Sequence, residues 1–126
     1  MISFDSFALE DNIPIYLQIN GFVKRGIVAG TIRDGDEMPS RRMLSALLGV
    51  NPNTVQKSYA MLEEEGLIHS RSGAKSCVAV DDAAIRRLRQ EVLSGSLTAV
   101  VEAMKQMGLT LEEAQTALRD YWEAET

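Results

Sequence analysis

Polar side chains gather between Asn53 and Lys57 in a pattern that suits contact with nucleic acid. The amides of Asn53 and Gln56 can pair bidentately with adenine, and the Lys57 ammonium can reach guanine or a phosphate oxygen. Thr54 offers a hydroxyl where a helix is expected to start, and hydroxyls and backbone N–H groups there suit phosphate oxygens. The same residues also start helices that touch nothing, because short motifs give false positives. The surrounding elements must therefore decide between the two interpretations.

Residues 39–67 predict two short helices joined by a tight turn. Ser40 is a suitable N-cap for the first helix, and Gly49 stands where the chain must reverse. Asn51 and Pro52 supply the N-cap and first position of the second helix. Apolar side chains at helical spacing are expected to form the buried faces: Met43, Leu44, Leu47, Leu48, Val55, Tyr59 and Leu62. This order is typical of a helix-turn-helix, whose second helix can enter the DNA major groove.

A β-hairpin is expected directly after these helices. Leu67 and Ile68 begin one apolar strand, and the run from Cys77 to Val80 supplies the other. The loop between them carries Arg71 and Lys75, which could neutralise phosphates. Hairpin tips of this composition are also common in proteins that bind no DNA. A helix-turn-helix followed by a hairpin predicts a winged helix-turn-helix.

The N-terminal side predicts one more helix, from Pro14 to Gly30. Its apolar stripe is formed by Ile15, Ile19, Phe22, Val23 and Ile27. Residues 1–13 give no clear signal beyond Phe4 and Phe7, which could attach the segment to the body. The turn-rich stretch at Asp34-Gly35 leads into a short extended piece before Pro39. The acidic residues there are interpreted as a solvated turn, since their spacing matches no calcium loop.

The last part of the chain predicts two helices. One covers residues 82–107, with a weak point at residues 94–96 where it could kink, and the other begins at Thr110 with a capping box to Glu113. Their apolar surface exceeds what two helices can hide in each other, which favours packing on a second copy. The side chains expected at this dimer contact are Leu88, Val92, Leu97, Val101, Met104, Leu118 and Trp122. Residues 1–80 are thus expected to bind DNA and residues 81–126 to dimerise.

A small-molecule effector stays open at this point. Its candidate place lies between the C-terminal helices, around Met104, Met107, Tyr121 and Trp122, where a dimer core is the favoured alternative.

Composition excludes several classes of protein. The apolar runs are too short for a membrane span, and the N-terminus lacks the pattern of a signal peptide. Cys77 is the one cysteine, so an internal disulfide and a zinc cluster are excluded, and a reducing cytoplasm is the expected compartment. A metal site or a cofactor is not expected.

The net charge of −5 argues mildly against nucleic acid, because simple DNA binders are basic. The acid is unevenly placed, however. Residues 81–126 hold five basic and nine acidic side chains, whereas residues 38–80 hold five basic and three acidic ones. Affinity is therefore expected to depend on specific contacts and on dimerisation rather than on bulk attraction.

Residues 12–80 as a whole resemble the GntR family of transcriptional regulators. The resemblance lies in residues 14–19 (PIYLQI), 35–42 (GDEMPSRR), 47–55 (LLGVNPNTV) and 59–68 (YAMLEEEGLI). The short C-terminal part and the recognition-helix sequence NPNTVQK are similar to the YtrA subfamily.

This resemblance implies a dimeric repressor that binds a palindromic operator, with Arg42, the start of the recognition helix and the wing Gly73 at the DNA. It also implies a frequent association with transporter operons. Two departures stand out. Arg41 occupies a position where many relatives are acidic, and Pro52 and Gln56 replace arginines of other subfamilies, so those base contacts cannot be copied.

The candidate DNA-binding residues are Ser40, Arg41, Arg42, Asn51, Asn53, Thr54, Gln56, Lys57, Arg71, Ser72, Gly73 and Lys75. The runner-up hypothesis is a winged helix used only for protein–protein contact, which the acidic charge would suit. An enzyme is disfavoured, because the chain offers one His, one Cys and no phosphate-binding loop.

Overall fold

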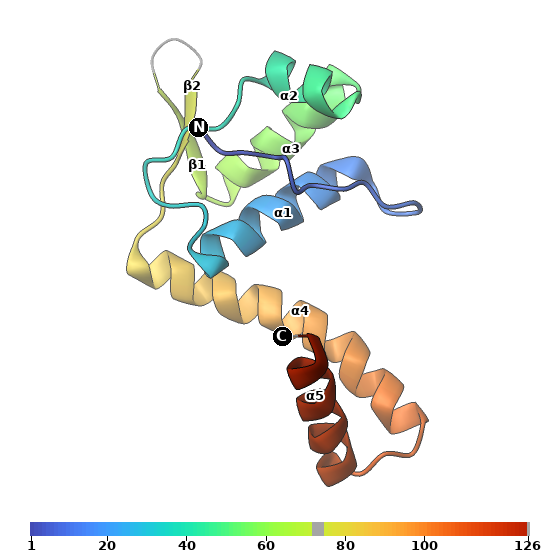
Figure 1. Cartoon of the computed structure of the whole chain (residues 1–126). Coiled ribbons are helices and arrows are strands. Elements are labelled where there is room, and N and C mark those ends of the chain that lie inside the picture. Colours follow the sequence, from blue (N-terminus) through green and yellow to red (C-terminus); the bar gives the residue numbers. More distant parts are fainter. Residues whose placement is uncertain (72–74, 126) are drawn as a thin grey trace. The chain divides into compact units, whose positions relative to one another are not determined.

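The computed structural model describes residues 1–71 and 75–125 (Figure 1). Its elements are α1 (Ile15–Ala29), α2 (Arg41–Leu48), α3 (Pro52–Glu64), β1 (Ile68–Arg71), β2 (Lys75–Val78), α4 (Asp82–Gln106) and α5 (Leu111–Glu125). The expected fold class, mostly helical with a small hairpin wing, is confirmed. The chain divides into two compact units, Met1–Arg89 and Gln90–Thr126, and the division falls inside α4.

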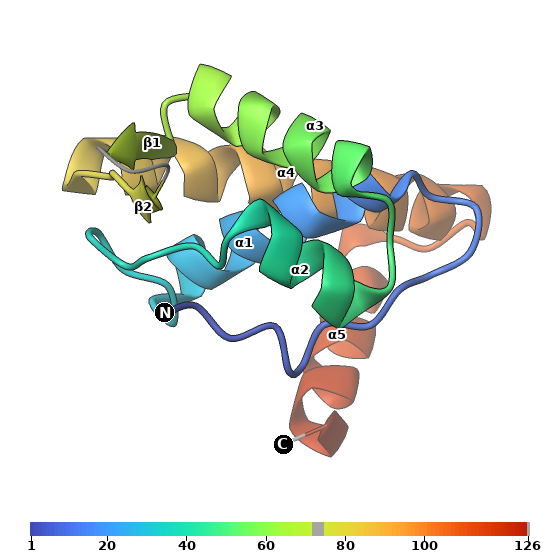
Figure 2. The ribbon, with the colours of Figure 1, turned by 90° about the horizontal axis from the view of Figure 1, so that it is seen from above.

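The core of the first unit lies between α1 and α3, which run side by side (Figures 1 and 2). Its fully buried aliphatic and aromatic side chains are Ile19, Val23, Ile27, Leu44, Val55, Tyr59 and Leu62. Burying one such side chain contributes about 1.5–3 kcal/mol. This stripe fixes the rotation of α3 about its own axis, and thereby determines which of its side chains point outward.

A polar pair crosses the same interface. Asn20 and Ser58 are 4% and 0% exposed, and the Asn20 amide lies 2.6 Å from Ser58 Oγ. Buried polar groups are retained when they are hydrogen-bonded to each other, because an unpaired one carries a desolvation cost. The pair therefore selects one alignment of α1 against α3.

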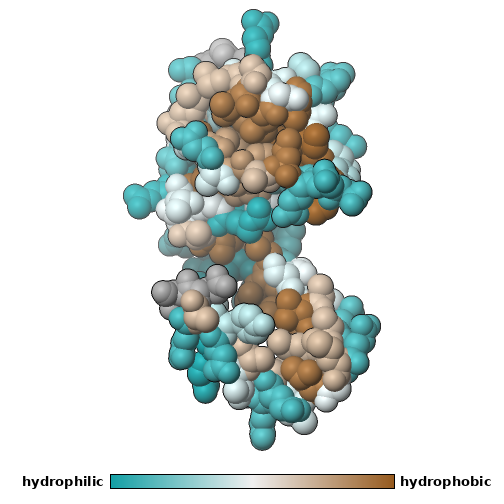
Figure 3. Space-filling view, turned by 45° about the vertical axis from the view of Figure 1, so that its right-hand side comes forward, coloured by the Kyte–Doolittle hydropathy of each residue, from teal (hydrophilic) through white to brown (hydrophobic). Residues whose placement is uncertain are grey.

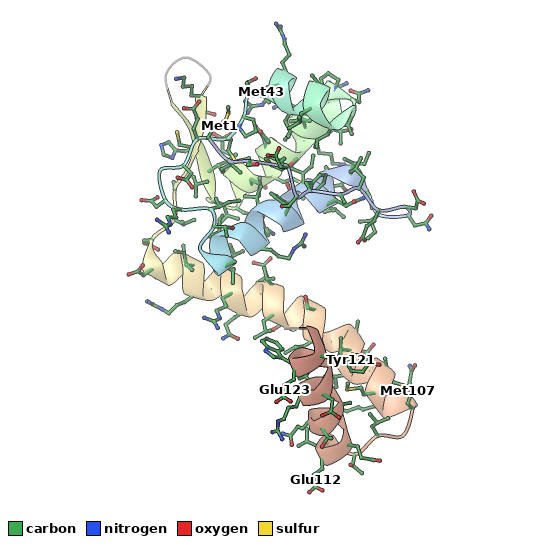
Figure 4. All side chains as sticks on the ribbon, viewed as in Figure 1. Met1, Met43, Met107, Glu112, Tyr121 and Glu123 are labelled. Atoms are coloured by element: carbon green, nitrogen blue, oxygen red, sulfur yellow. The ribbon has the colours of Figure 1, made fainter. Side chains whose placement is uncertain are left out.

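Helix α2 has a narrower buried face than its sequence predicts. Leu44 is buried, but Met43 is 48% exposed and Leu47 is 60% exposed, so the prediction that both belong to the packed face was wrong. Figure 4 shows Met43 at the outer side of α2. Helix α2 has eight residues and packs mainly on α3. It therefore buries only a narrow stripe, which consists of Leu44 and Ser45.

The wing is a two-stranded antiparallel sheet with a third segment against β2. Ile68 pairs with Val78 and His69 with Cys77, and Glu37 forms a bridge to Cys77 from the other side. The Met38 N–H donates to the Ser76 carbonyl at 2.8 Å. The extended piece predicted before Pro39 is therefore part of the wing's base.

The N-terminal segment, which the sequence left open, lies over the outer face of α1. Phe4 is 3% exposed and stacks on Phe22 with ring centroids 4.8 Å apart, and Phe7 meets Phe22 edge-on at 5.4 Å. The Gln18 amide holds the following turn by donating to the carbonyls of Glu10 and Ile13 at 3.0 and 2.7 Å. Three aromatic rings and one amide thus anchor a segment without regular structure.

The second unit contains α4 from Gln90 onward and all of α5. Helix α4 is continuous through residues 94–96, where the sequence suggests that it could kink. The predicted capping box is confirmed: the Thr110 N–H donates to Glu113 Oε1 at 2.9 Å, and the Glu113 N–H donates to Thr110 Oγ1 at 3.1 Å. Hydrogen bonds from the Thr110 backbone, and secondarily from its side chain, lower the pKa of the Glu113 carboxyl.

Residues 1–71 and 75–125 include no helix whose length and apolar character would let it cross a lipid bilayer.

We expect Ser58→Ala to lower the free energy of unfolding by about 1 kcal/mol, because it removes the hydrogen bond between Ser58 Oγ and the buried Asn20 amide. Replacing both residues, as Asn20→Leu with Ser58→Ala, is expected to recover part of this loss, since no polar group is then left unpaired. Urea unfolding measures both. Ser96→Ala, at an exposed position of α4, is the control and should stay within about 0.5 kcal/mol of the wild type. Equal losses of unfolding free energy in Ser58→Ala and Ser96→Ala would show that the hydrogen bond between Ser58 and Asn20 does not stabilise the fold.

Candidate nucleic-acid interface

The backbone at the start of α3 is held by a side-chain cap and a proline. Asn51 accepts a hydrogen bond from the Asn53 N–H at 2.8 Å, and Pro52 occupies the first turn. Because the opposite face of α3 is buried, Asn53, Gln56 and Lys57 stand exposed. Thr54 lies half-buried beside them. The predicted amides and ammonium are therefore brought together on one surface of α3.

The start of α2 supplies a second polar end. Ser40 Oγ accepts from the Met43 N–H at 3.0 Å, which confirms the predicted cap. Arg42 follows in the first turn and is exposed. Backbone N–H groups and the positive end of the helix dipole favour anions at such a terminus, and a neighbouring guanidinium adds directional donors. The beginnings of α2 and α3 lie on the same side of the first unit (Figures 1 and 2).

The surroundings of Arg41 could not be expected from helical periodicity. Its guanidinium carbon lies 5.1 Å from the centre of the Tyr59 ring, and its Nε is buried without a hydrogen-bond partner. The Tyr59 hydroxyl donates to the Pro39 carbonyl at 2.6 Å. Burial raises the pKa of the Tyr59 phenol far above its ordinary value, while the Arg41 charge acts weakly in the opposite direction. The Tyr59 side chain is therefore uncharged and held in place beneath the Arg41 guanidinium.

Lys57 rests on a tyrosine as well. Its Nζ lies 4.0 Å from the centre of the Tyr16 ring, a cation–π distance. Tyr16 does not belong to the apolar stripe predicted for this helix, and α1 brings it to the side of α3. Contacts of this kind join residues far apart in the chain, so helical periodicity within one element cannot reveal them.

The wing contributes Lys75, which is exposed and has its Nζ 4.0 Å from Glu37 Oε2. An exposed pair at this distance is worth little, so the ammonium stays available to an external anion. The candidate residues Ser72 and Gly73, and the side chain of Arg71, lie outside the described residues. The backbone of Arg71 ends β1.

Acidic residues occupy the other end of α3, with Glu65 directly after its last residue. Glu65 pairs with Lys24 of α1 at 2.8 Å, and Glu63 Oε1 accepts from the Ser70 N–H at 3.3 Å. Helix α3 therefore carries amide and cationic side chains at its start and carboxylates at its end. The acidic net charge of the chain does not describe the surface where the candidate contacts meet.

The expected dimer residues differ in exposure. Leu88 is 4% exposed and belongs to the core of the first unit, so its burial needs no second chain. Val92 and Met104 are half-buried. The remaining four are exposed by 43% or more: Leu97, Val101, Leu118 and Trp122. Apolar surface of the second unit is visible in Figure 3, and Met107 and Tyr121 add to the exposed set (Figure 4).

Comparison with known proteins places this geometry among regulators. Residues 15–78 match the family model described as bacterial regulatory proteins, gntR family. Bacillus subtilis (strain 168) has an uncharacterized HTH-type transcriptional regulator, YhcF, that is 32% identical over 114 residues, covering 90% of this chain and 94% of that protein. The HTH-type transcriptional repressor YtrA of the same organism is 33% identical over 98 residues, covering 78% and 71%.

A solved structure extends the similarity to three dimensions. It is a GntR family transcriptional regulator from Listeria monocytogenes, with a TM-score of 0.81 and 30% identity over 89% of this chain and 98% of that one.

We expect Asn51→Asp to separate the two tasks of this position. A carboxylate caps a helix as well as an amide and suits the positive end of the dipole, so the free energy of unfolding should be unchanged or higher. We expect affinity for a DNA duplex to fall, because a carboxylate at a DNA contact repels phosphates. Urea unfolding and fluorescence anisotropy measure the two properties. The control Thr110→Asp adds the same charge at the N-cap of α5, and an equal loss of affinity in both variants would show that Asn51 is not at the contact.

Proposed function

Because the chain belongs to the GntR family of bacterial regulatory proteins, and to its YtrA subfamily, it is a DNA-binding transcriptional regulator, and we propose that it acts as a homodimeric repressor. The proposed target is a palindromic operator in the DNA upstream of its own gene. The name of the relative YtrA, a repressor, supports the direction of regulation. The cytoplasm is the proposed compartment, which suits the buried, free Cys77.

The observation that carries the proposal is the joint exposure of the starts of α2 and α3. In this arrangement α3 lies in the major groove with Asn53 and Gln56 toward base edges, where amides recognise adenine. Arg42 and the N-terminus of α2 bind the phosphate backbone, which sets register without reading sequence. The hairpin follows the backbone, with Lys75 as its described cation.

Dimerisation is proposed through α4 and α5. The four most exposed members of the expected contact form apolar surface that a single chain leaves in water. Large apolar side chains left in water on two successive helices are typical of surfaces that are buried between copies. A two-fold pair would present two recognition helices to half-sites roughly 34 Å apart. The region around Met104 and Trp122 is then a dimer core rather than an effector pocket.

We expect Arg42→Ala and Gln56→Ala to weaken DNA binding in different ways. Arg42→Ala removes a phosphate contact, so it should weaken binding to the upstream duplex and to random duplex alike, and lower the salt slope by about 0.9. Gln56→Ala removes a base contact, so it should cost roughly 1–3 kcal/mol on the specific duplex and little on the random one. Fluorescence anisotropy at several salt concentrations measures both.

Wild-type protein that binds no duplex in a salt-dependent way would overturn the proposed function. Equal losses on both duplexes for Gln56→Ala would count against a base-reading role for this residue alone.

We expect Leu118→Glu to convert the dimer to a monomer, because it places a charge in the apolar contact of α5. Light scattering after size-exclusion chromatography should show half the wild-type mass. Operator affinity should fall by orders of magnitude, because each half-site is then bound separately. Glu112→Gln, at an exposed position of the first turn of α5, is the control and should remain dimeric. A wild-type protein that is already monomeric at micromolar concentration would refute the proposed assembly.

A further inference from the structure

The guanidinium of Arg41 is incompletely satisfied within the chain. Its Nε is buried and has no hydrogen-bond acceptor. The ion pairs found among the described residues do not include Arg41. A buried N–H without a partner costs free energy that a face-on aromatic contact offsets only in part. The free protein thus keeps a partly desolvated positive charge that destabilises it, at a position next to the proposed DNA contacts.

Tyr59 fixes where this charge lies. The ring is fully buried and its hydroxyl is bonded to the Pro39 carbonyl, so it has little freedom to move. Arg41, one turn before Leu44 on the inner side of α2, lies on this ring with its guanidinium carbon 5.1 Å from the centroid. The tyrosine ring attracts the cation through its quadrupole but does not neutralise its charge. A carboxylate at the same place would neutralise it.

Arg41 lies beside other hydrogen-bond donors at the start of α2. Arg41 is the first residue of α2, directly after the Ser40 cap and before the exposed Arg42. Two successive arginines and the free N–H groups of the helix start therefore belong to the same first turn of α2, which suits a run of phosphates. A planar fork of donors suits a phosphate better than a Lys ammonium does.

From these observations we infer that Arg41 is a phosphate-binding residue whose guanidinium is held in its binding position by the Tyr59 ring and left unpaired until DNA is bound. The inference rests on the proposed function and adds a positioning residue, Tyr59, to it. The buried Nε faces the interior, so a phosphate would bind the outer end of the guanidinium and supply the counter-charge that the described carboxylates do not.

The decisive variant is Arg41→Met, which keeps an unbranched chain of similar length against the Tyr59 ring and removes the charge. We expect its melting temperature to equal or exceed that of the wild type, because an unsatisfied donor is lost. We expect its affinity to fall on the order of ten-fold for both the upstream duplex and a random duplex, and its salt slope to fall by about 0.9. Arg41→Lys should keep the wild-type slope while recovering only part of the affinity.

Arg25→Met is the matched control. It removes one positive charge from α1, at an exposed position outside the starts of α2 and α3, so affinity and slope should stay near the wild-type values. The role of Tyr59 is tested by Tyr59→Leu, which should lower affinity in the wild-type background and not in the Arg41→Met background. Tyr59→Phe keeps the ring and should bind nearly as the wild type does, although it melts earlier because it leaves the Pro39 carbonyl unpaired.

Arg41→Met that melts earlier and binds with wild-type affinity and slope would overturn the inference, since Arg41 would then be structural. Tyr59→Leu that lowers affinity equally in both backgrounds would remove Tyr59 from the assignment. Wild-type protein that binds no duplex would overturn the proposed function and this inference together, so the two failures are distinguishable.

Discussion

The contact between α1 and α3 is the constraint on which the rest of the first unit depends. Val55, Tyr59 and Leu62 bury one side of α3, and the paired Asn20 and Ser58 admit a single alignment of the two helices. Packing alone would tolerate small sliding of apolar surfaces, whereas a buried hydrogen bond does not. The amides exposed at the start of α3 are therefore positioned by residues on its buried side.

Much of this arrangement follows from local signals. Ser40, Asn51 and Thr110 act as caps at the positions that their side-chain chemistry predicts, because capping involves neighbours two or three residues away. Periodicity likewise gave the buried stripes of α1 and α3. It overestimated the packed face of α2, since Met43 and Leu47 have helical spacing but no neighbouring element to cover them.

What the sequence could not show are contacts between elements. The rings of Tyr16 and Tyr59 lie under Lys57 and Arg41, and each contact depends on how two helices cross. The anchoring of residues 1–13 is of the same kind, because Phe4 and Phe7 find Phe22 only once α1 is folded. Two of the cations at the candidate interface, Arg41 and Lys57, thus rest on aromatic faces. Glu63 and Glu65 are engaged at the far end of α3. A chain that is acidic overall can in this way keep a cationic surface.

The hydrogen bond from the Ile2 N–H to the Glu37 carbonyl, 2.9 Å long, covers part of the edge of the wing's sheet. Glu37 pairs with Cys77 of β2 on one side. The side of Glu37 that points away from β2 is therefore the outer edge of the wing's sheet. Exposed sheet edges are templates for pairing with strands of other molecules, and natural proteins cover or interrupt them. The first residues of this chain cover that edge at Glu37. The Glu37 carbonyl is therefore already paired within the chain and is not left open to a strand of another molecule.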